Sequence, residues 1–478
     1  MRVGNDRLSF GTDGPRSDPR RMAIFAVLIV AGALLVWLHE TGQVPALFEP
    51  THIPTRNAVS YAEQGQAYFS AGNLEEAIRV YQEAVRVDPG DGRMWADLAR
   101  IQTYSSALLT TADDRRARLA AARESVERAV EANPDDSTAA AIRAFVYDWS
   151  ATAEDATTGA SQREEYLTTA QTSVARALQL EPGNVLALAF QAEVYVDQQK
   201  FTQAMAVASR AASLVAPDDP FSMDVHRVYG TVLESNAQYR LAIEEYLRAA
   251  AVAPNFTYLY LLIGANYRQL RDIESALEYF DRAVRINEQL AIEDPTPYLA
   301  IGKTYMQDGE FFIAARNIER ALAISPSNPD IYGRLGIVFF KSRNYEGAIV
   351  ALQCAVDGCP QDVSQTLLCE YVYDCDAGSE EAQSYGVEVV GLPLRDDSLE
   401  YYYTYGSVLT YFRNSANYPS ACVDAERIFR VVLTTYGSDP TVADIAAASR
   451  ELCSAAGGAG SPEPSPSPAA PQTPSQTP

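Results

Sequence analysis

The stretch that decides the fold is GQAYFSAGNLEEAIRVYQEAVRVDP, residues 65–89. It contains two short helical patterns separated by the turn-forming residues 70–73, and Pro89 ends the second pattern. Small residues alternate with large ones, and the small ones are Gly65, Ala77 and Ala84. Two helices cross closely only when small side chains occupy the contact points and large ones fill the groove beside them. The stretch therefore predicts a tightly packed helix pair.

The same pattern recurs along the chain. The last small residue of each unit is an alanine, at Ala84, Ala129, Ala177, Ala211, Ala249, Ala283, Ala321 and Ala355. Three of the seven steps are 34 residues, and the others add 11, 14, 4 and 4 residues to that period. A small residue also recurs in each first helix, at Gly65, Ala99, Ala144, Ala192, Gly230, Gly264, Gly302 and Gly336. This register resembles that of the tetratricopeptide repeat (TPR) family.

The resemblance implies an all-α, right-handed TPR superhelical solenoid of eight to nine helix pairs. Eight TPR-like repeats are expected over residues 58–362, because each pair leaves an apolar face that the next pair covers. We interpret the extra residues near 108–119 and 152–165 as longer helices plus a rim loop. Residues 363–456 are expected to form a divergent ninth repeat and a capping helix, and 386–394 (GVEVVGLPL) a strand or an extended loop.

The N-terminal segment contains 17 consecutive uncharged residues, 22–38. A helix of this length spans roughly 25 Å, and Arg20 and Arg21 precede it, so we predict a transmembrane anchor with a cytoplasmic N-terminus and extracytoplasmic repeats. A cleaved signal peptide and a buried globular helix stay open as alternatives. We expect residues 1–21 to be a disordered cytoplasmic tail, 39–57 a proline-containing spacer, and 457–478 a disordered proline-rich tail.

All six cysteines follow residue 350: Cys354, Cys359, Cys369, Cys375, Cys422 and Cys453. An even number on the predicted extracytoplasmic side indicates disulfides. We expect the first four to pair among themselves, stapling the irregular segment to repeat eight, and Cys422 to pair with Cys453. Zinc binding and free thiols stay open as alternatives.

Catalytic and metal-binding patterns are scarce. The three histidines are His39, His52 and His226, and we interpret His226 as a packing residue. No zinc-protease, nucleophile-elbow or phosphate-loop motif occurs. An acidic cluster at Asp374, Asp376, Glu380 and Glu381 departs from calcium-loop spacing. We therefore predict a non-enzyme with no cofactor and no metal, and the net charge of −24 disfavours a nucleic-acid partner.

In TPR proteins the first helices of the repeats line a concave groove that receives peptides. Carried over to this sequence, the resemblance implies a peptide-binding groove of aromatic, apolar and basic residues. These are Phe69, Arg93, Arg100, Tyr104, Phe145, Trp149, Arg227, Tyr258, Leu261, Arg268, Leu299, Lys303, Phe340, Lys341 and, in the ninth repeat, Tyr403. Some of them are also explained by packing between repeats. The clamp that binds chaperone tails is absent, since Ala62 and Gln66 occupy its positions in repeat one.

The expected function is a membrane-anchored scaffold that binds a protein or peptide partner in this groove. An accessory subunit presenting substrate to an envelope polysaccharide or secretion machine is the alternative, and glycan binding would distinguish it. A cytoplasmic regulator is a third possibility. The oligomeric state is left open by the sequence.

Overall fold

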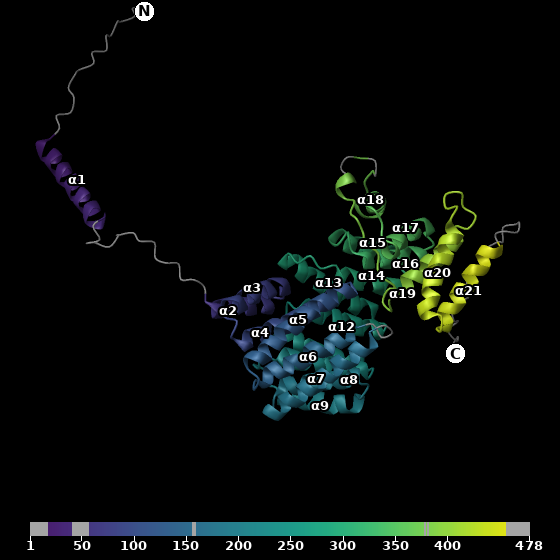
Figure 1. Ribbon diagram of the computed structural model, residues 1–478, viewed down its shortest axis with the longest axis horizontal. Helices are drawn as coiled ribbons and strands as arrows, with labels where there is room; N and C mark the ends of the chain where they lie inside the picture. The colour runs from purple at the N-terminus through teal and green to yellow at the C-terminus, as the bar shows by residue number, and fades with distance from the viewer. Residues whose placement is uncertain (1–17, 41–56, 155–158, 377–378, 380–381, 456–478) are drawn as a thin grey trace, which may run out of the picture. The chain divides into compact units, whose positions relative to one another are not determined.

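The computed structural model describes residues 18–40, 57–154, 159–376, 379 and 382–455, in two compact units, Met1–Arg56 and Asn57–Pro478 (Figure 1). The predictions for residues 1–17, 41–56 and 456–478 lie outside the described residues, as do those for His52, Glu380 and Glu381. The described part of the first unit is helix α1 (Pro19–Glu40). Its segment Pro19–Leu38 has a mean hydropathy of 2.4 and is exposed, which suits either a membrane span or a signal sequence.

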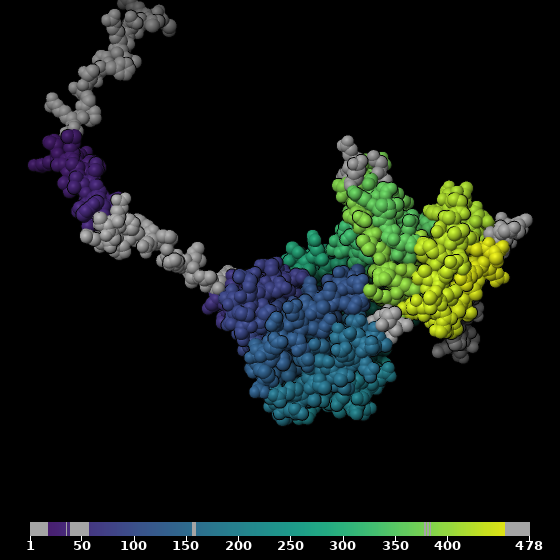
Figure 2. Space-filling view, viewed as in Figure 1, coloured from purple at the N-terminus to yellow at the C-terminus, as the bar shows by residue number. Residues whose placement is uncertain are grey.

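The second unit is a solenoid of helix pairs (Figure 1). The pairs are α2 (Ala58–Ser70) with α3 (Leu74–Val87), α4 (Gly92–Ser106) with α5 (Ala112–Ala132), α6 (Ser137–Thr152) with α7 (Ala160–Leu180), α8 (Val185–Asp197) with α9 (Phe201–Leu214), α10 (Ser222–Ser235) with α11 (Tyr239–Val252), α12 (Thr257–Gln269) with α13 (Ile273–Leu290), α14 (Thr296–Asp308) with α15 (Phe311–Ile324), and α16 (Pro329–Lys341) with α17 (Tyr345–Val356). Side chains of neighbouring pairs form one continuous packed surface in Figure 2.

The predicted pairing of a small with a large residue is present in the helix pairs whose first helix carries a recurring glycine. A Cβ added to Gly65 would lie 2.5 Å from the Tyr81 ring, and one added to Gly230 would lie 2.5 Å from the Tyr246 ring. The eight recurring alanines are all buried, with exposures of 0 or 1%. These close contacts explain why the sequence period follows the helix pairs.

The two longest interruptions of the period are extra helical turns. Helices α5 and α7 have 21 residues each, whereas α3 and α9 have 14. This matches the interpretation of longer helices, and the residues joining α4 to α5 form the loop that contains Leu108 and Thr110.

The C-terminal part is less regular. It contains α18 (Gln361–Leu368), the π-helix η1 (Cys369–Tyr373), the 3₁₀ helix η2 (Ala382–Ser384), and then α19 (Leu399–Tyr411), α20 (Ala421–Tyr436) and α21 (Pro440–Ala455). Helices α19 and α20 pack as a ninth pair, and α21 packs on both. Residues 386–394 are an extended loop. An isolated antiparallel bridge pairs Val389 with Cys359, and the Leu392 N–H donates to the Ala355 carbonyl at 2.8 Å.

Contacts also join repeats that are distant in sequence. The Phe69 ring of α2 lies 6.1 Å from the Phe256 ring at the start of α12. A Cβ on Gly72, which has φ +84°, would lie 2.1 Å from the Asn255 carbonyl oxygen. The Thr296 hydroxyl donates to the Leu108 carbonyl at 3.1 Å, and Arg395 donates to Asp113 at 2.8 Å. An ordinary solenoid repeat contacts only its neighbours, so here the first turn of the superhelix closes on itself.

Candidate functional site: the inner wall of the solenoid

The first helices of the pairs supply the inner wall, and its N-terminal half holds a buried ion-pair network. Arg100 Nε donates to Asp224 Oδ1 at 2.9 Å, and a second guanidinium nitrogen pairs with the other oxygen. Arg227 donates to both oxygens of Glu193, at 2.6 and 2.7 Å. Tyr104 joins the two pairs, because its hydroxyl donates to Asp224 at 2.5 Å and accepts from Arg227 Nε at 3.1 Å. Helices α4, α8 and α10 are thereby tied together.

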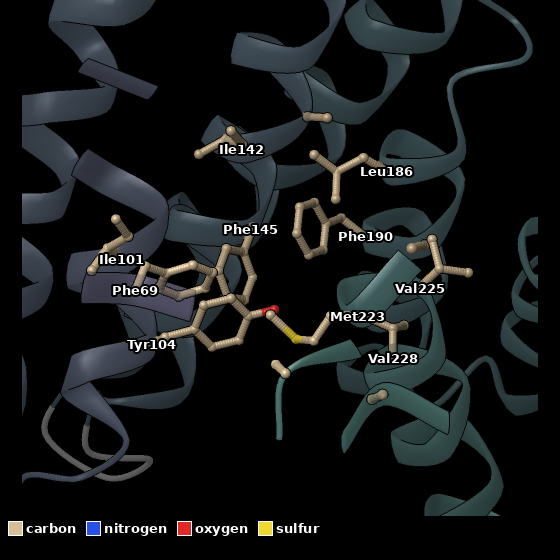
Figure 3. Close-up of a cluster of buried hydrophobic side chains, with 14 of the residues drawn as sticks. Phe69, Ile101, Tyr104, Ile142, Phe145, Leu186, Phe190, Met223, Val225 and Val228 are labelled. Atoms are coloured by element: carbon tan, nitrogen blue, oxygen red, sulfur yellow. The ribbon is translucent and has the colours of Figure 1, made fainter. Parts of the chain in front are cut away.

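Aromatic rings pack around Tyr104, and Figure 3 shows those of Phe69 and Phe145 beside it. The Tyr104 ring lies 5.1 Å from that of Phe145 and 5.3 Å from that of Phe256. The Arg227 guanidinium lies 5.5 Å from the Trp149 ring centroid, and the Trp149 indole donates to Glu193 at 3.1 Å. Guanidinium groups over aromatic faces gain cation–π attraction where water is excluded.

Burial sets the charge states here. Burial raises the pKa of Tyr104 well above its usual value, so its hydroxyl stays a donor. Burial alone would lower the pKa of Arg227, but the charge and hydrogen bonds of Glu193 together with Tyr104 outweigh it and raise the pKa. The pKa of Arg100 is likewise raised, by Asp224 against the effect of burial, so both arginines remain cations.

The predicted exposure in an open groove is wrong for four residues, which are buried and line neither pocket described below: Phe69, Arg100, Tyr104 and Phe145. Arg227 and Leu299 are also buried, but each lines one of those pockets. For those that precede α12, the physical reason is the closed first turn, which brings α2 and α4 against α10 and α12. Arg93, Lys303 and Lys341 are exposed, and Trp149, Tyr258, Leu261, Arg268, Phe340 and Tyr403 are half-buried. For these the groove stays a prediction.

Four of the predicted residues meet at one pocket of about 260 Å³ between α12, α14, α16 and the loop after α4: Leu261, Arg268, Leu299 and Lys303. Arg115 and Arg334 complete a lining that contains four cations and no carboxylate. Arg334 pairs with Asp330 at 2.8 Å, and Arg115 lies 3.5 Å from Asp397. Among the described residues, no carboxylate lies within 4.0 Å of the Arg268 or Lys303 nitrogens. We call this site the basic pocket.

Arg268 and Lys303, the two cations without a nearby carboxylate, both have lowered pKa values. Burial lowers the pKa of Arg268. Burial, followed by the charges of Arg268 and Arg334, lowers the pKa of Lys303, and Glu400 opposes the shift. Like charges held together at a partly enclosed site destabilise one another until an anion binds.

A second pocket, of about 480 Å³, lies on the wall formed by α6, α8, α10 and α12, and the predicted residues Trp149, Arg227 and Tyr258 line it. Its acidic lining residues are Glu193, Asp197 and Glu234. We call this site the acidic pocket. Sequence reasoning missed these carboxylates, although Glu193 is a lone acidic residue in the otherwise apolar stretch VLALAFQAEVYV of α8, which was the available signal.

The cysteines form three disulfides, Cys354–Cys359, Cys369–Cys375 and Cys422–Cys453. The pairing agrees with the prediction. The expected staple between the irregular segment and repeat eight is wrong, because the first two disulfides close loops of only 5 and 6 residues in sequence. Cys422–Cys453 joins α20 to α21. Within the described residues, no group of three or more histidine, cysteine or acidic side chains is arranged to hold a metal ion.

Comparison with known proteins agrees with the helix-pair architecture. Family models described as tetratricopeptide repeat match residues 58–101, 230–291 and 299–363. These three segments carry tetratricopeptide repeats. The anaphase-promoting complex subunit 3 of Schizosaccharomyces pombe is 21% identical over 131 residues, which are 27% of this chain and only 19% of that protein.

Similar solved structures include TTC0263, a TPR protein of Thermus thermophilus, with 16% identity and a TM-score of 0.35 over 44% of this chain and 98% of that chain. The human IFIT1 dimer with m7Gppp-AAAA has 15% identity and a TM-score of 0.43, over 64% of this chain and 73% of that chain.

Proposed function

We propose that this chain is a non-enzymatic scaffold, held at a membrane by α1, that binds an acidic segment of a protein partner on its inner wall. TPR arrays generally bind proteins, and the basic pocket gives the inner wall an open stretch with uncompensated positive charge. The proposal rests on the basic pocket, and in particular on Arg268 and Lys303, which lack carboxylate partners among the described residues.

Charge complementarity identifies the chemistry of the partner. A carboxylate entering the pocket would accept hydrogen bonds from Arg268 and Lys303 and remove their mutual repulsion. Leu261, Leu299 and Phe280 give the pocket an apolar floor. Its volume of about 260 Å³ is below that of a drug-sized ligand site, so it suits the end of one acidic side chain or a chain terminus.

Two features support the membrane attachment. Arg20 and Arg21 precede the apolar part of α1, as is common on the cytoplasmic side of a span. The three disulfides fit an oxidising compartment for the repeats.

Protease treatment of intact cells, followed by mass mapping, should remove the repeats and spare a fragment containing α1. Protection of the repeats would contradict this topology.

Site-specific crosslinking tests the scaffold proposal. A photoreactive residue at Ala300, which lines the basic pocket, should crosslink the full chain in its native membrane to one partner segment rich in Asp or Glu. The control position is Lys200, an exposed residue in the α8–α9 turn. A synthetic peptide of the crosslinked segment should bind the purified chain.

Arg268→Gln combined with Lys303→Gln should weaken that binding at least about tenfold, because two charge-assisted contacts are removed. Lys200→Gln should leave it unchanged. Equal crosslinking at both positions, or binding that survives the double substitution, would overturn the proposal.

A further inference from the structure

The acidic pocket combines carboxylates with aromatic faces. Its volume is about 480 Å³, and its aromatic lining residues are Trp149, Tyr239, Tyr246 and Tyr258. The Trp149 and Tyr258 rings lie 6.0 Å apart in an edge-to-face arrangement. Several rings around one cavity are the arrangement that attracts cations through their faces.

The charges of the lining are unbalanced. Its three carboxylates, Glu193, Asp197 and Glu234, face a single cation, Arg227, which is fully engaged with Glu193. Glu234 accepts hydrogen bonds from the Tyr246 hydroxyl at 2.8 Å and from the Asn266 amide at 2.9 Å, both neutral donors. Within the described chain, no cationic nitrogen lies within 4.0 Å of Asp197 or Glu234.

A fourth carboxyl lies directly behind the wall. Asp148, on α6, is only 1% exposed, and neither of its oxygens accepts a hydrogen bond from any described donor. Its carboxyl lies against that of Asp197 on the pocket wall. A buried polar group without a donor costs about 1–3 kcal/mol, so such a group in a folded protein points to a missing partner.

A proton on the two neighbouring carboxyls can take the place of that partner. Burial, then the charges of Asp197 and Glu193, raise the pKa of Asp148 well above its usual value, opposed by Arg227 on α10. Burial and Glu193 also raise the pKa of Asp197 to about 6, opposed by Asp148 and by Arg163 on α7. The two carboxyls therefore share a proton near neutral pH.

We propose that the acidic pocket binds an organic cation, an ammonium or guanidinium group, carried by a basic side chain of a peptide or by a free polyamine. The cation donates to Asp197 and Glu234 and stacks on the rings of Trp149 and Tyr258. Its charge displaces the proton that Asp148 and Asp197 share. The inference uses a separate set of side chains from the basic pocket, so it does not depend on the proposed function.

Calorimetric titration of the full chain in detergent tests this site. The probes are acetyl-arginine methylamide, its neutral isostere acetyl-citrulline methylamide, and spermidine. The arginine probe should bind saturably below about 10 mM, and the citrulline probe at least about tenfold more weakly. Titration in two buffers of different ionisation enthalpy should show proton release near pH 6. Tighter binding of spermidine than of the arginine probe would identify a polyamine as the source of the cation. Tighter binding of the arginine probe would identify a basic side chain of a peptide.

Asp197→Asn should weaken binding about tenfold or more and abolish the proton release. Glu244→Gln, at an exposed position of α11, is the matched control and should change neither. If Asp197→Asn impairs folding, Glu234→Gln supplies the same test from α10. Equal binding of the arginine and citrulline probes, or unchanged binding in both pocket variants, would overturn the proposal.

Discussion

The two halves of the inner wall are built from the same helix pairs but treat charge in opposite ways. Around Tyr104, the buried arginines Arg100 and Arg227 each have a carboxylate partner. Around Lys303, neighbouring cations face a pocket with no carboxylate lining. A repeat framework fixes where inner-wall side chains lie. The identity of a few residues then decides whether the wall becomes core or remains a site.

The largest expected effect tests whether the buried ion pairs around Tyr104 stabilise that half of the inner wall. Arg227→Met leaves Glu193 buried without its cation, which should lower the free energy of unfolding by about 3–5 kcal/mol. Chemical denaturation of the full chain in detergent measures this. Arg227→Met combined with Glu193→Met should recover most of the loss, and Arg79→Met on the exposed outer face is the control. A loss below about 1 kcal/mol would mean that the network is not what stabilises this half.

The C-terminal end uses covalent links in place of such a network. Replacing both Cys422 and Cys453 by serine opens a loop of 31 residues in sequence, which should cost about 3 kcal/mol. Hydrogen exchange should show α20 and α21 opening first, with the helices around Tyr104 unaffected. Uniform destabilisation of both halves would show that they unfold as one unit.

The pH dependence of stability distinguishes the acidic pocket from the rest of the wall. The pKa of Asp197 is about 6 in the folded chain and near 3.8 when unfolded, so the folded state binds more protons between these values. Its contribution to stability therefore falls as pH rises from about 4 to about 6. Asp197→Asn removes this penalty, so the variant should gain about 2 kcal/mol relative to the wild type at pH 7 compared with pH 4. If the difference in stability between the variant and the wild type is the same at pH 4 and at pH 7, Asp148 and Asp197 do not share a proton.

The smallest effect has the opposite sign from the first. Lys303→Met removes a cation that faces Arg268 and Arg334, so the unbound chain should become more stable, by about 0.5 kcal/mol. Thermal melting at low salt is the measurement, and added salt should shrink the gain. Destabilisation would mean that Lys303 has a structural partner.

The contacts inside a helix pair were predictable because they depend on local spacing. Gly65 and Tyr81 are 16 residues apart, and their close approach follows from the period of two packed helices. The position of Lys303 on the inner wall was predictable for the same reason. The contact between Arg100 and Asp224 could not be predicted, because the two residues are 124 positions apart in sequence. Whether they meet depends on small rotations summed over several repeat junctions.

The contact between Gly72 and the Asn255 carbonyl has a consequence for the evolution of this chain. Solenoids commonly gain or lose whole modules, because a new module needs only matching neighbours. Here an added or deleted pair between α2 and α12 would move Phe69 away from Phe256 and separate Arg100 from Asp224. The number of modules in the first turn is therefore fixed by ring closure, and variation in length should be tolerated only beyond it.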